Sequence, residues 1–247
     1  MSKEHGTPVD RVSLVEVGPR DGLQNEPRLL SLAQRLLLIN RLAESGLQRI
    51  EVGAFVSPKR VPQMADSAEL FKALPRKGAT RYGALVPNLQ GLQAAIQARV
   101  DEIGLFTACS DGFTRANIGI GVEESLIRFA PLVAEARRLG IKVRGYLSTV
   151  IACPYDGPTR PKRVAALAER LLDLGCHEIS LGDTIGTGTP GTVAPMLDAV
   201  LHEVPAGRLA VHFHDTYGQG LANLLATSAS LMRKLHQLRQ SLHASDD

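Results

Sequence analysis

Tryptophan is absent from the 247-residue sequence, and aromatic residues make up only 4% of it. Proteins that bind single-stranded nucleic acid stack the bases on aromatic side chains, so this composition disfavours that class. The net charge is small as well, because 28 lysine and arginine residues exceed 25 aspartate and glutamate residues by only three. A charge of +3 does not indicate a nucleic-acid surface, although it suits a phosphorylated small molecule.

Cysteine is also scarce: the sequence has three cysteines and no CxxC pair. This usage is typical of a reduced compartment rather than of a disulfide framework. No stretch approaches the ~20 consecutive apolar residues that a membrane-spanning helix needs, and the N-terminal MSKEHGTPVD lacks the apolar core of a signal peptide. We therefore expect a cytoplasmic protein with no membrane and no nucleic acid among its partners.

Hydrophobic residues make up 44% of the chain and charged residues 21%, values that are typical of a folded globular protein. Short, mostly apolar segments indicate buried strands. They are Val12–Val17, Arg49–Gly53, Arg81–Val86, Glu102–Thr107, Ile141–Leu147, Glu178–Leu181 and Leu209–Phe213. Between these segments lie longer stretches whose apolar residues are spaced as on one face of a helix. Ser31 and Gln34 are a predicted capping box, and Thr189 followed by Pro190 is a predicted helix start.

Alternation of strands and helices predicts a parallel sheet covered by helices. No linker rich in Pro, Ser or Gly divides the chain, so a single domain is expected. The choice is between a (β/α)₈ TIM barrel and an open doubly wound sheet. Seven strands are visible, whereas a closed barrel needs eight.

The strongest local signal is VHFHDTYG, in which His212 and His214 are two residues apart at the end of an apolar run. Residues i and i+2 of a strand point to the same face, so the two imidazoles can chelate a divalent metal. The alternative is one core histidine and one surface histidine. Position favours the metal site, because active sites of α/β barrels lie at the carboxyl ends of the strands.

A second signal is VEVGPRDGLQNE, where Arg20 and Asp21 directly follow a predicted strand. They form either a surface ion pair in a turn or a site in which Asp21 is a third metal ligand and Arg20 stabilises an anion. Glu51 lies within the next predicted strand, where a buried glutamate is rare unless it is paired. It is either exposed or a partner of Arg20.

Asp183 precedes a loop rich in glycine and threonine, in SLGDTIGTGTPG. The loop matches no nucleotide-phosphate motif. It is either a flexible loop with an Asx turn or a loop whose backbone approaches a ligand, with Asp183 presented at the strand end. Cys153, in IACPYDG, is interpreted as a plain buried cysteine rather than as a nucleophile.

These motifs together closely resemble those of hydroxymethylglutaryl-CoA lyase, within the metal-dependent acyl-CoA lyases and synthases built on a TIM barrel. The resemblance covers roughly residues 11–226. It rests on VEVGPRDGLQNE, IEVGAFVSPKRVPQM, RGYLSTVIACPYDGP, EISLGDTIGTGTPG and VHFHDTYGQGLAN. The GPRDGLQNE form is typical of the lyase, whereas the related synthases for isopropylmalate and citramalate usually have TLRDG there.

The resemblance implies cleavage of 3-hydroxy-3-methylglutaryl-CoA to acetyl-CoA and acetoacetate, a reaction of leucine degradation and ketone-body metabolism. It implies that Asp21, His212 and His214 bind Mg²⁺ or Mn²⁺. Arg20 would bind the substrate and stabilise an oxyanion, while Glu51 and Asp183 would line the same pocket. The implied catalytic set is thus Arg20, Glu51, Asp183 and His212, with an acyl-CoA as substrate and a homodimer as a possible assembly.

The resemblance fades after about Ala226. The family's last strand, its GGCPYA-type loop with the acid–base cysteine, and an asparagine metal ligand have no counterpart in LLATSASLMRKLHQLRQSLHASDD. We expect residues 1–226 to form an incomplete TIM barrel and residues 227–247 a divergent helical tail that is not a separate domain. The expected alternatives are weak lyase activity, an impaired paralogue that binds only metal or acyl-CoA, and a related aldolase or synthase.

Overall fold

The structure is a computed structural model that describes residues 12–76 and 78–243, with the side chains described as far as Leu231. A curled parallel sheet forms its centre, with strand order β1-β2-β3-β4-β7-β8. Its strands are β1 (Arg49–Ala54), β2 (Arg81–Leu85), β3 (Glu102–Ala108), β4 (Lys142–Ser148), β7 (Glu178–Asp183) and β8 (Leu209–Phe213). A small antiparallel hairpin, β5 (Ala152–Cys153) and β6 (Gly157–Pro158), follows β4.

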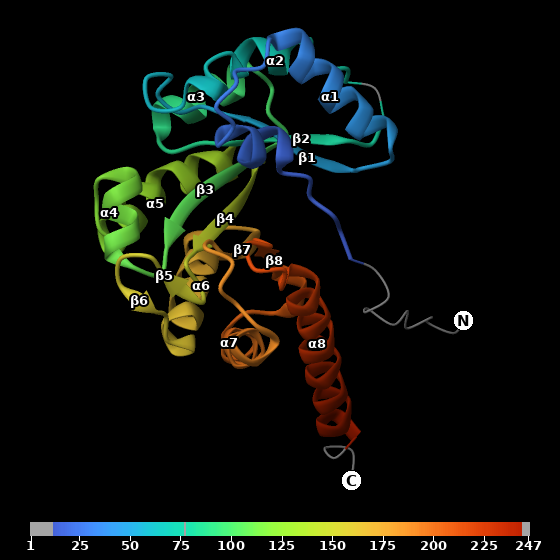
Figure 1. Cartoon of the computed structure of the whole chain (residues 1–247), viewed down its shortest axis with the longest axis vertical. Coiled ribbons are helices and arrows are strands. Elements are labelled where there is room, and N and C mark those ends of the chain that lie inside the picture. Colours follow the sequence, from blue (N-terminus) through green and yellow to red (C-terminus); the bar gives the residue numbers. More distant parts are fainter. Residues whose placement is uncertain (1–11, 77, 244–247) are drawn as a thin grey trace.

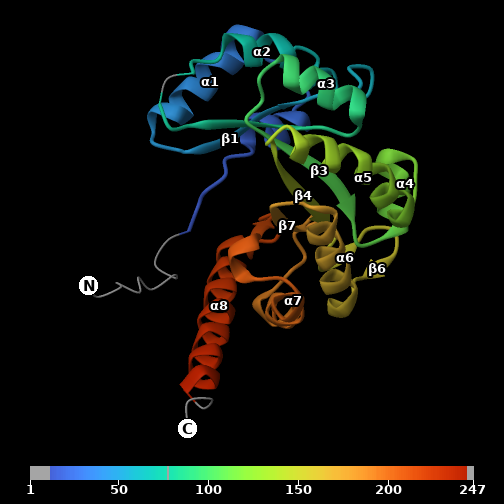
Figure 2. The ribbon, with the colours of Figure 1, turned by 180° about the vertical axis from the view of Figure 1, so that it is seen from behind.

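Helices α1 to α7 form an arc around the outside of this sheet (Figures 1 and 2). They cover the apolar outer face, which supplies most of the core. The helices are α1 (Leu32–Glu44), α2 (Ser67–Ala73), α3 (Leu89–Gln97), α4 (Asp111–Ile118), α5 (Val122–Arg138), α6 (Pro161–Leu174), α7 (Pro190–Glu203) and α8 (Gly220–His243), with 3₁₀ turns η2 (Pro62–Met64) and η3 (Ala206–Arg208).

The predicted helix starts are confirmed. Ser31 and Gln34 form the capping box of α1, and Thr189 caps α7 with Pro190 in its first turn. Gly175, which directly follows α6, is in the left-handed conformation, which glycine adopts without a Cβ clash. Local sequence signals therefore set these boundaries.

The prediction of a strand at Val12–Val17 is wrong. This segment makes only one parallel bridge, between Glu16 and Ile50, and the side chains of Val12 and Leu14 are 86% and 68% exposed. Its chain turns immediately afterwards into the π-helix η1 (Gly18–Gly22). Apolar residues alone do not make a strand, because a ladder also needs a neighbour along its length. The other six predicted strands are confirmed.

The TIM-barrel expectation is confirmed as a partial barrel: six strands curl without closing into a ring. Helix α8 runs unbroken across residue 226, the boundary that the sequence predicted for the barrel domain; the boundary itself stays a prediction. Within the described residues, no helix is both long enough and apolar enough to span a membrane. The carboxyl ends of the parallel strands share one rim, and Asp21, His212 and His214 lie together there.

Candidate metal centre

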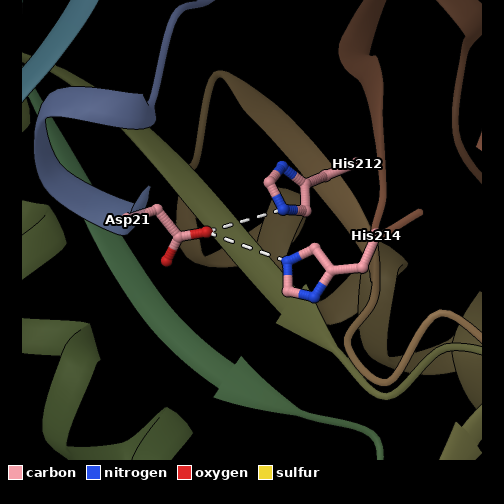
Figure 3. Close-up of side chains that lie close together, drawn as sticks. All are labelled: Asp21, His212 and His214. Carbon is pink, nitrogen blue, oxygen red and sulfur yellow. Dashed lines mark ion pairs between the residues drawn. The ribbon is translucent and has the colours of Figure 1, made fainter. Parts of the chain in front are cut away.

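Three predicted ligands, Asp21, His212 and His214, meet at the rim of the curled sheet (Figure 3). Asp21 Oδ2 lies 3.6 Å from Nε2 of His212 and 3.9 Å from Nε2 of His214. The two imidazole rings have centroids 4.8 Å apart, as expected for residues i and i+2 on one face of an extended chain. Donor atoms of all three residues lie within 4.8 Å of one another.

The π-helix η1 positions Asp21. Pro19 occupies its first turn, and the backbone N–H groups of Arg20 and Asp21 both donate to the carbonyl of Val17, at 3.1 and 2.6 Å. The Glu16–Ile50 bridge fixes the start of this turn beside β1. A π-helical turn is rare and is frequent at functional sites. Asp21 thus approaches from the β1 edge of the sheet, while both histidines come from β8 and the loop after it.

The charges of the site influence one another. Burial alone would raise the pKa of Asp21, but the facing imidazole of His214 and the guanidinium of Arg20 outweigh it and hold the pKa at about 2. Burial lowers the pKa of His212, whereas the facing Asp21 carboxylate raises the pKa of His214. At neutral pH the site therefore offers an ionised carboxylate and a neutral His212.

Arg20 is held by two carboxylates. Its Nε donates to Glu51 and its Nη1 donates to Oδ1 of Asp21 at 2.6 Å. Glu51 is buried and also accepts the hydroxyl of Tyr146, whose ring lies 5.4 Å from the guanidinium carbon of Arg20. Burial would lower the pKa of Arg20, yet the charges of Glu51 and Asp21 raise it. Of the two alternatives for Glu51, the structure therefore shows the partner of Arg20.

Tyr146 is the residue that the sequence interpretation missed. Burial and the charge of Glu51 raise its pKa well above the ordinary value, so it remains a neutral hydrogen-bond donor. Gly104 makes room for it, since a Cβ on that glycine would lie 2.6 Å from a carbon of the ring. A tyrosine two residues after an arginine in the predicted strand, in RGYLS, was the available signal. That signal did not specify a partner on β1.

Asp183 lies deeper than the metal candidates. It is fully buried, and its Oδ2 accepts the backbone N–H of Gly188 at 2.7 Å. Asn223 donates to the carbonyl of the same glycine at 2.9 Å. Asp183 thus fixes the glycine-rich loop, and it is not among the residues that line the cavity beside the site. Cys153 is buried, and its sulfur accepts the N–H groups of Tyr155 and Asp156.

A cavity of about 1180 Å³ adjoins the three candidate ligands. It is larger than the ~300–1,000 Å³ usual for small-molecule pockets. Its lining includes the candidate ligands as well as apolar and polar side chains of α4 and α5, such as Phe113, Asn117, Arg128 and Phe129. Lining residues that bear on its chemistry are Arg20, Asp21, Arg60, Phe113, Asn117, Arg128, Tyr146, Ser148, Thr184, His212 and His214.

The three candidate ligands fit a divalent cation. A metal at ~2.1 Å from each donor brings neighbouring donors to about 3 Å from one another, so the observed 3.6 and 3.9 Å separations need only small side-chain rotations. Two imidazoles and one carboxylate suit first-row divalent ions with open coordination positions. The side chains of Asp21, His212 and His214 are 29%, 29% and 41% exposed, which leaves access for substrate oxygens.

Fold and site together define an α/β barrel-type protein with a two-histidine, one-carboxylate centre at the strand ends. A family model described as HMGL-like matches residues 11–234. The chain belongs to the HMGL-like family.

Individual relatives agree with this assignment. A 3-hydroxy-3-isohexenylglutaryl-CoA/hydroxy-methylglutaryl-CoA lyase from Pseudomonas aeruginosa is 51% identical over 217 residues, which cover 88% of this chain and 72% of that protein. The mitochondrial hydroxymethylglutaryl-CoA lyase of Bos taurus is 51% identical over 220 residues, covering 89% and 68%. The resemblance inferred from the motifs is confirmed.

Solved structures share the fold. A hydroxymethylglutaryl-CoA lyase from Pseudomonas aeruginosa superimposes with a TM-score of 0.86 at 50% identity, over 88% of this chain and 73% of that one. An HMG-CoA lyase from Acinetobacter baumannii in complex with coenzyme A and 3-methylmalate has a TM-score of 0.86 at 35% identity, over 91% and 73%. The match therefore covers most of this chain and the larger part of each of these lyase structures.

Proposed function

We propose that this protein is a carbon–carbon lyase that cleaves 3-hydroxy-3-methylglutaryl-CoA, or a close homologue of it, to acetyl-CoA and acetoacetate. The observation that carries the proposal is the meeting of Asp21, His212 and His214 beside a large cavity, in a chain about half identical to named lyases. Asp21, His212 and His214 would hold Mg²⁺ or Mn²⁺. When bound, that cation supplies Lewis-acid stabilisation of an alkoxide.

Arg20 is the proposed electrostatic catalyst. The substrate hydroxyl loses a proton and the fragment beside the thioester departs as an enolate, so negative charge develops on oxygen. Glu51 and Asp21 hold Nε and Nη1 of Arg20, while its Nη2 makes no hydrogen bond within the described part of the chain and the residue lines the cavity. A fixed donor of this kind is effective because it needs no reorganisation during the reaction.

The other proposed catalytic residues act around Arg20. Glu51 and Tyr146 fix the guanidinium. His212, whose pKa is lowered by burial, stays neutral and able to bind a cation or accept a proton. Asp183 fixes the loop that contributes Thr184 to the cavity wall.

An acyl-CoA is the proposed substrate class. The cavity extends from the candidate metal centre to α4 and α5, and Arg60 and Arg128 line it, where they can attract phosphate groups. The relative from Acinetobacter baumannii binds coenzyme A in its structure. Three free, buried cysteines support a reduced compartment such as the cytoplasm.

The resemblance implied a cysteine as the acid–base residue, and none of the described residues that line the cavity is a cysteine, so we expect slow turnover. A missing proton donor commonly costs ~10²–10⁴-fold in rate. The test is accumulation of acetoacetate and acetyl-CoA over hours from 3-hydroxy-3-methylglutaryl-CoA with Mg²⁺, followed by mass spectrometry. Product should form with the unmodified protein and not with Asp21→Asn. Equal amounts from both, or none from either, would contradict the proposal.

A further inference from the structure

The candidate ligands come from opposite edges of the sheet. Asp21 follows the segment that bridges β1 at one edge, whereas His212 lies in β8 at the other edge and His214 directly follows β8. Among the described residues, no backbone hydrogen bond joins these two edges. The distance between Asp21 and the histidines therefore depends on how tightly the intervening strands curl.

A network of charged side chains crosses the concave face of the sheet at the opposite ends of the strands. Nη1 of Arg49 on β1 lies 3.0 and 3.1 Å from the two carboxylate oxygens of Glu178 on β7. Nη2 of Arg49 donates to Glu102 of β3 at 2.5 Å, and Arg144 of β4 donates to Glu178 at 2.5 Å. Three strands separate β1 from β7 in the sheet. The Arg49–Glu178 pair, called the chord below, therefore connects two non-adjacent strands directly across the concave face of the sheet.

The network is shielded from water. The side chains of Arg49, Glu178, Arg144 and Glu102 are 17%, 14%, 5% and 11% exposed. Shielded charges interact more strongly than surface charges. Without the Arg49 guanidinium, the carboxylates of Glu102 and Glu178 would share Arg144 as their one remaining arginine partner among the described residues, with Nε2 of His177 3.9 Å from Glu102. The two carboxylates would then repel each other across the concave face.

Both ends of this chord are joined to the candidate metal centre. The carbonyl of Arg49 accepts the N–H of Glu16 at 3.0 Å, at the start of the segment that presents Asp21. On the other side, β7 pairs with β8 from Ile179–Leu209 to Asp183–Phe213. The six residues from Glu178 to Asp183 span roughly 17 Å of strand, so Glu178 lies far from the candidate metal ligands.

We propose that Arg49 is a positioning residue: its guanidinium binds Glu178 through Nη1 and Glu102 through Nη2. These contacts set the curl of the sheet and thereby the separation of Asp21 from His212 and His214. This inference rests on the proposed metal site for its chemical consequence. The geometric part, that Arg49 sets the separation of the two edges, stands on the cross-sheet contacts alone. Lysine at this position would keep the charge but lose the second nitrogen, so it could not bind Glu178 and Glu102 in the same way at once.

The test measures edge separation and metal affinity in the same variants. Spin labels on cysteines placed at Leu37 of α1 and Leu221 of α8 report the separation, since these side chains are 59% and 79% exposed. The three native cysteines are buried. Electron–electron distance measurements should give a longer or broader distribution in Arg49→Met than in the unsubstituted protein. Mn²⁺ affinity by calorimetry should fall about 10-fold, the scale of a lost supporting contact around a metal site.

Two further variants keep the result interpretable. Arg49→Lys should give a label separation and a Mn²⁺ affinity between those of the unsubstituted protein and Arg49→Met. It takes the place of Arg49→Met in the test if the methionine variant does not fold. Arg170→Met, which removes an exposed ion pair with Glu123, should change neither quantity. A lower melting temperature is not evidence for the inference.

Unchanged label distances in Arg49→Met overturn the inference, as does a changed distance with unchanged Mn²⁺ affinity. If the unsubstituted protein binds no Mn²⁺, the proposed function fails, and the label distances alone decide whether Arg49 sets the edge separation.

Discussion

Replacement of Glu51 by glutamine tests the buried network behind the candidate metal centre. Glu51 and Arg20 have side chains that are 5% and 9% exposed, and glutamine keeps the volume while removing the charge. The hydroxyl of Tyr146 would then face an amide and Arg20 would keep only Asp21 as a charged partner. Removing one member of a buried ion pair costs about 3–5 kcal/mol, and we expect about 3 kcal/mol because Asp21 remains. For a chain of this size, that corresponds to a melting temperature lower by ~6–12 °C.

The assay is urea and thermal unfolding followed by circular dichroism at neutral pH. Arg20→Met together with Glu51→Gln should be more stable than the sum of the single changes, because the double variant leaves no unpaired buried charge. Glu123→Gln, which alters an exposed ion pair with Arg170, should leave the melting temperature unchanged. A free energy of unfolding for Glu51→Gln within about 1 kcal/mol of the unsubstituted protein, or strict additivity in the double variant, would refute the reasoning.

Three further outcomes are expected. Gly104→Ala should destabilise by about 1–3 kcal/mol in urea unfolding, because its Cβ would lie 2.6 Å from the Tyr146 ring; an unchanged midpoint would show that the ring moves freely. Mn²⁺ affinity should fall with decreasing pH, because a ligand must be neutral and Asp21 raises the pKa of His214. The loss should begin near or above pH ~6.5 and approach tenfold per pH unit, and constant affinity down to pH ~5.5 would contradict it. Arg20→Gln should lower turnover ~10²–10³-fold with Mn²⁺ affinity changed much less, and full turnover would remove Arg20 from the mechanism.

Strand positions were predictable because the sheet is parallel and its strands are buried, which gives short apolar runs bounded by turns. Six of seven predicted strands are confirmed on this basis. Val12–Val17 has the same apolar character but lacks a neighbouring strand along its length, and composition contains no information on neighbours. The chain nevertheless continues from Val17 into the π-helix η1, and this turn places Asp21 at the rim.

The meeting of Asp21 with His212 and His214 was predictable because all three follow or end predicted strands, and those ends share a rim in this architecture. Their roles as ligands stay a prediction. The Glu51–Tyr146 contact and the Arg49–Glu178 chord were not predictable. Each joins strands that are far apart in the sheet order, and only the curl brings their side chains together.

The central claim, that Asp21, His212 and His214 form a divalent-cation site, is tested most directly by a Mn²⁺ titration followed by electron paramagnetic resonance. The unsubstituted protein should bind one Mn²⁺ per chain, and Asp21→Asn and His214→Ala should each bind at least about 10-fold more weakly. Asp156→Asn is the control, because Asp156 accepts the N–H of Gly112 away from the candidate site. Equal Mn²⁺ affinity in the unsubstituted protein and in both site variants would contradict the claim.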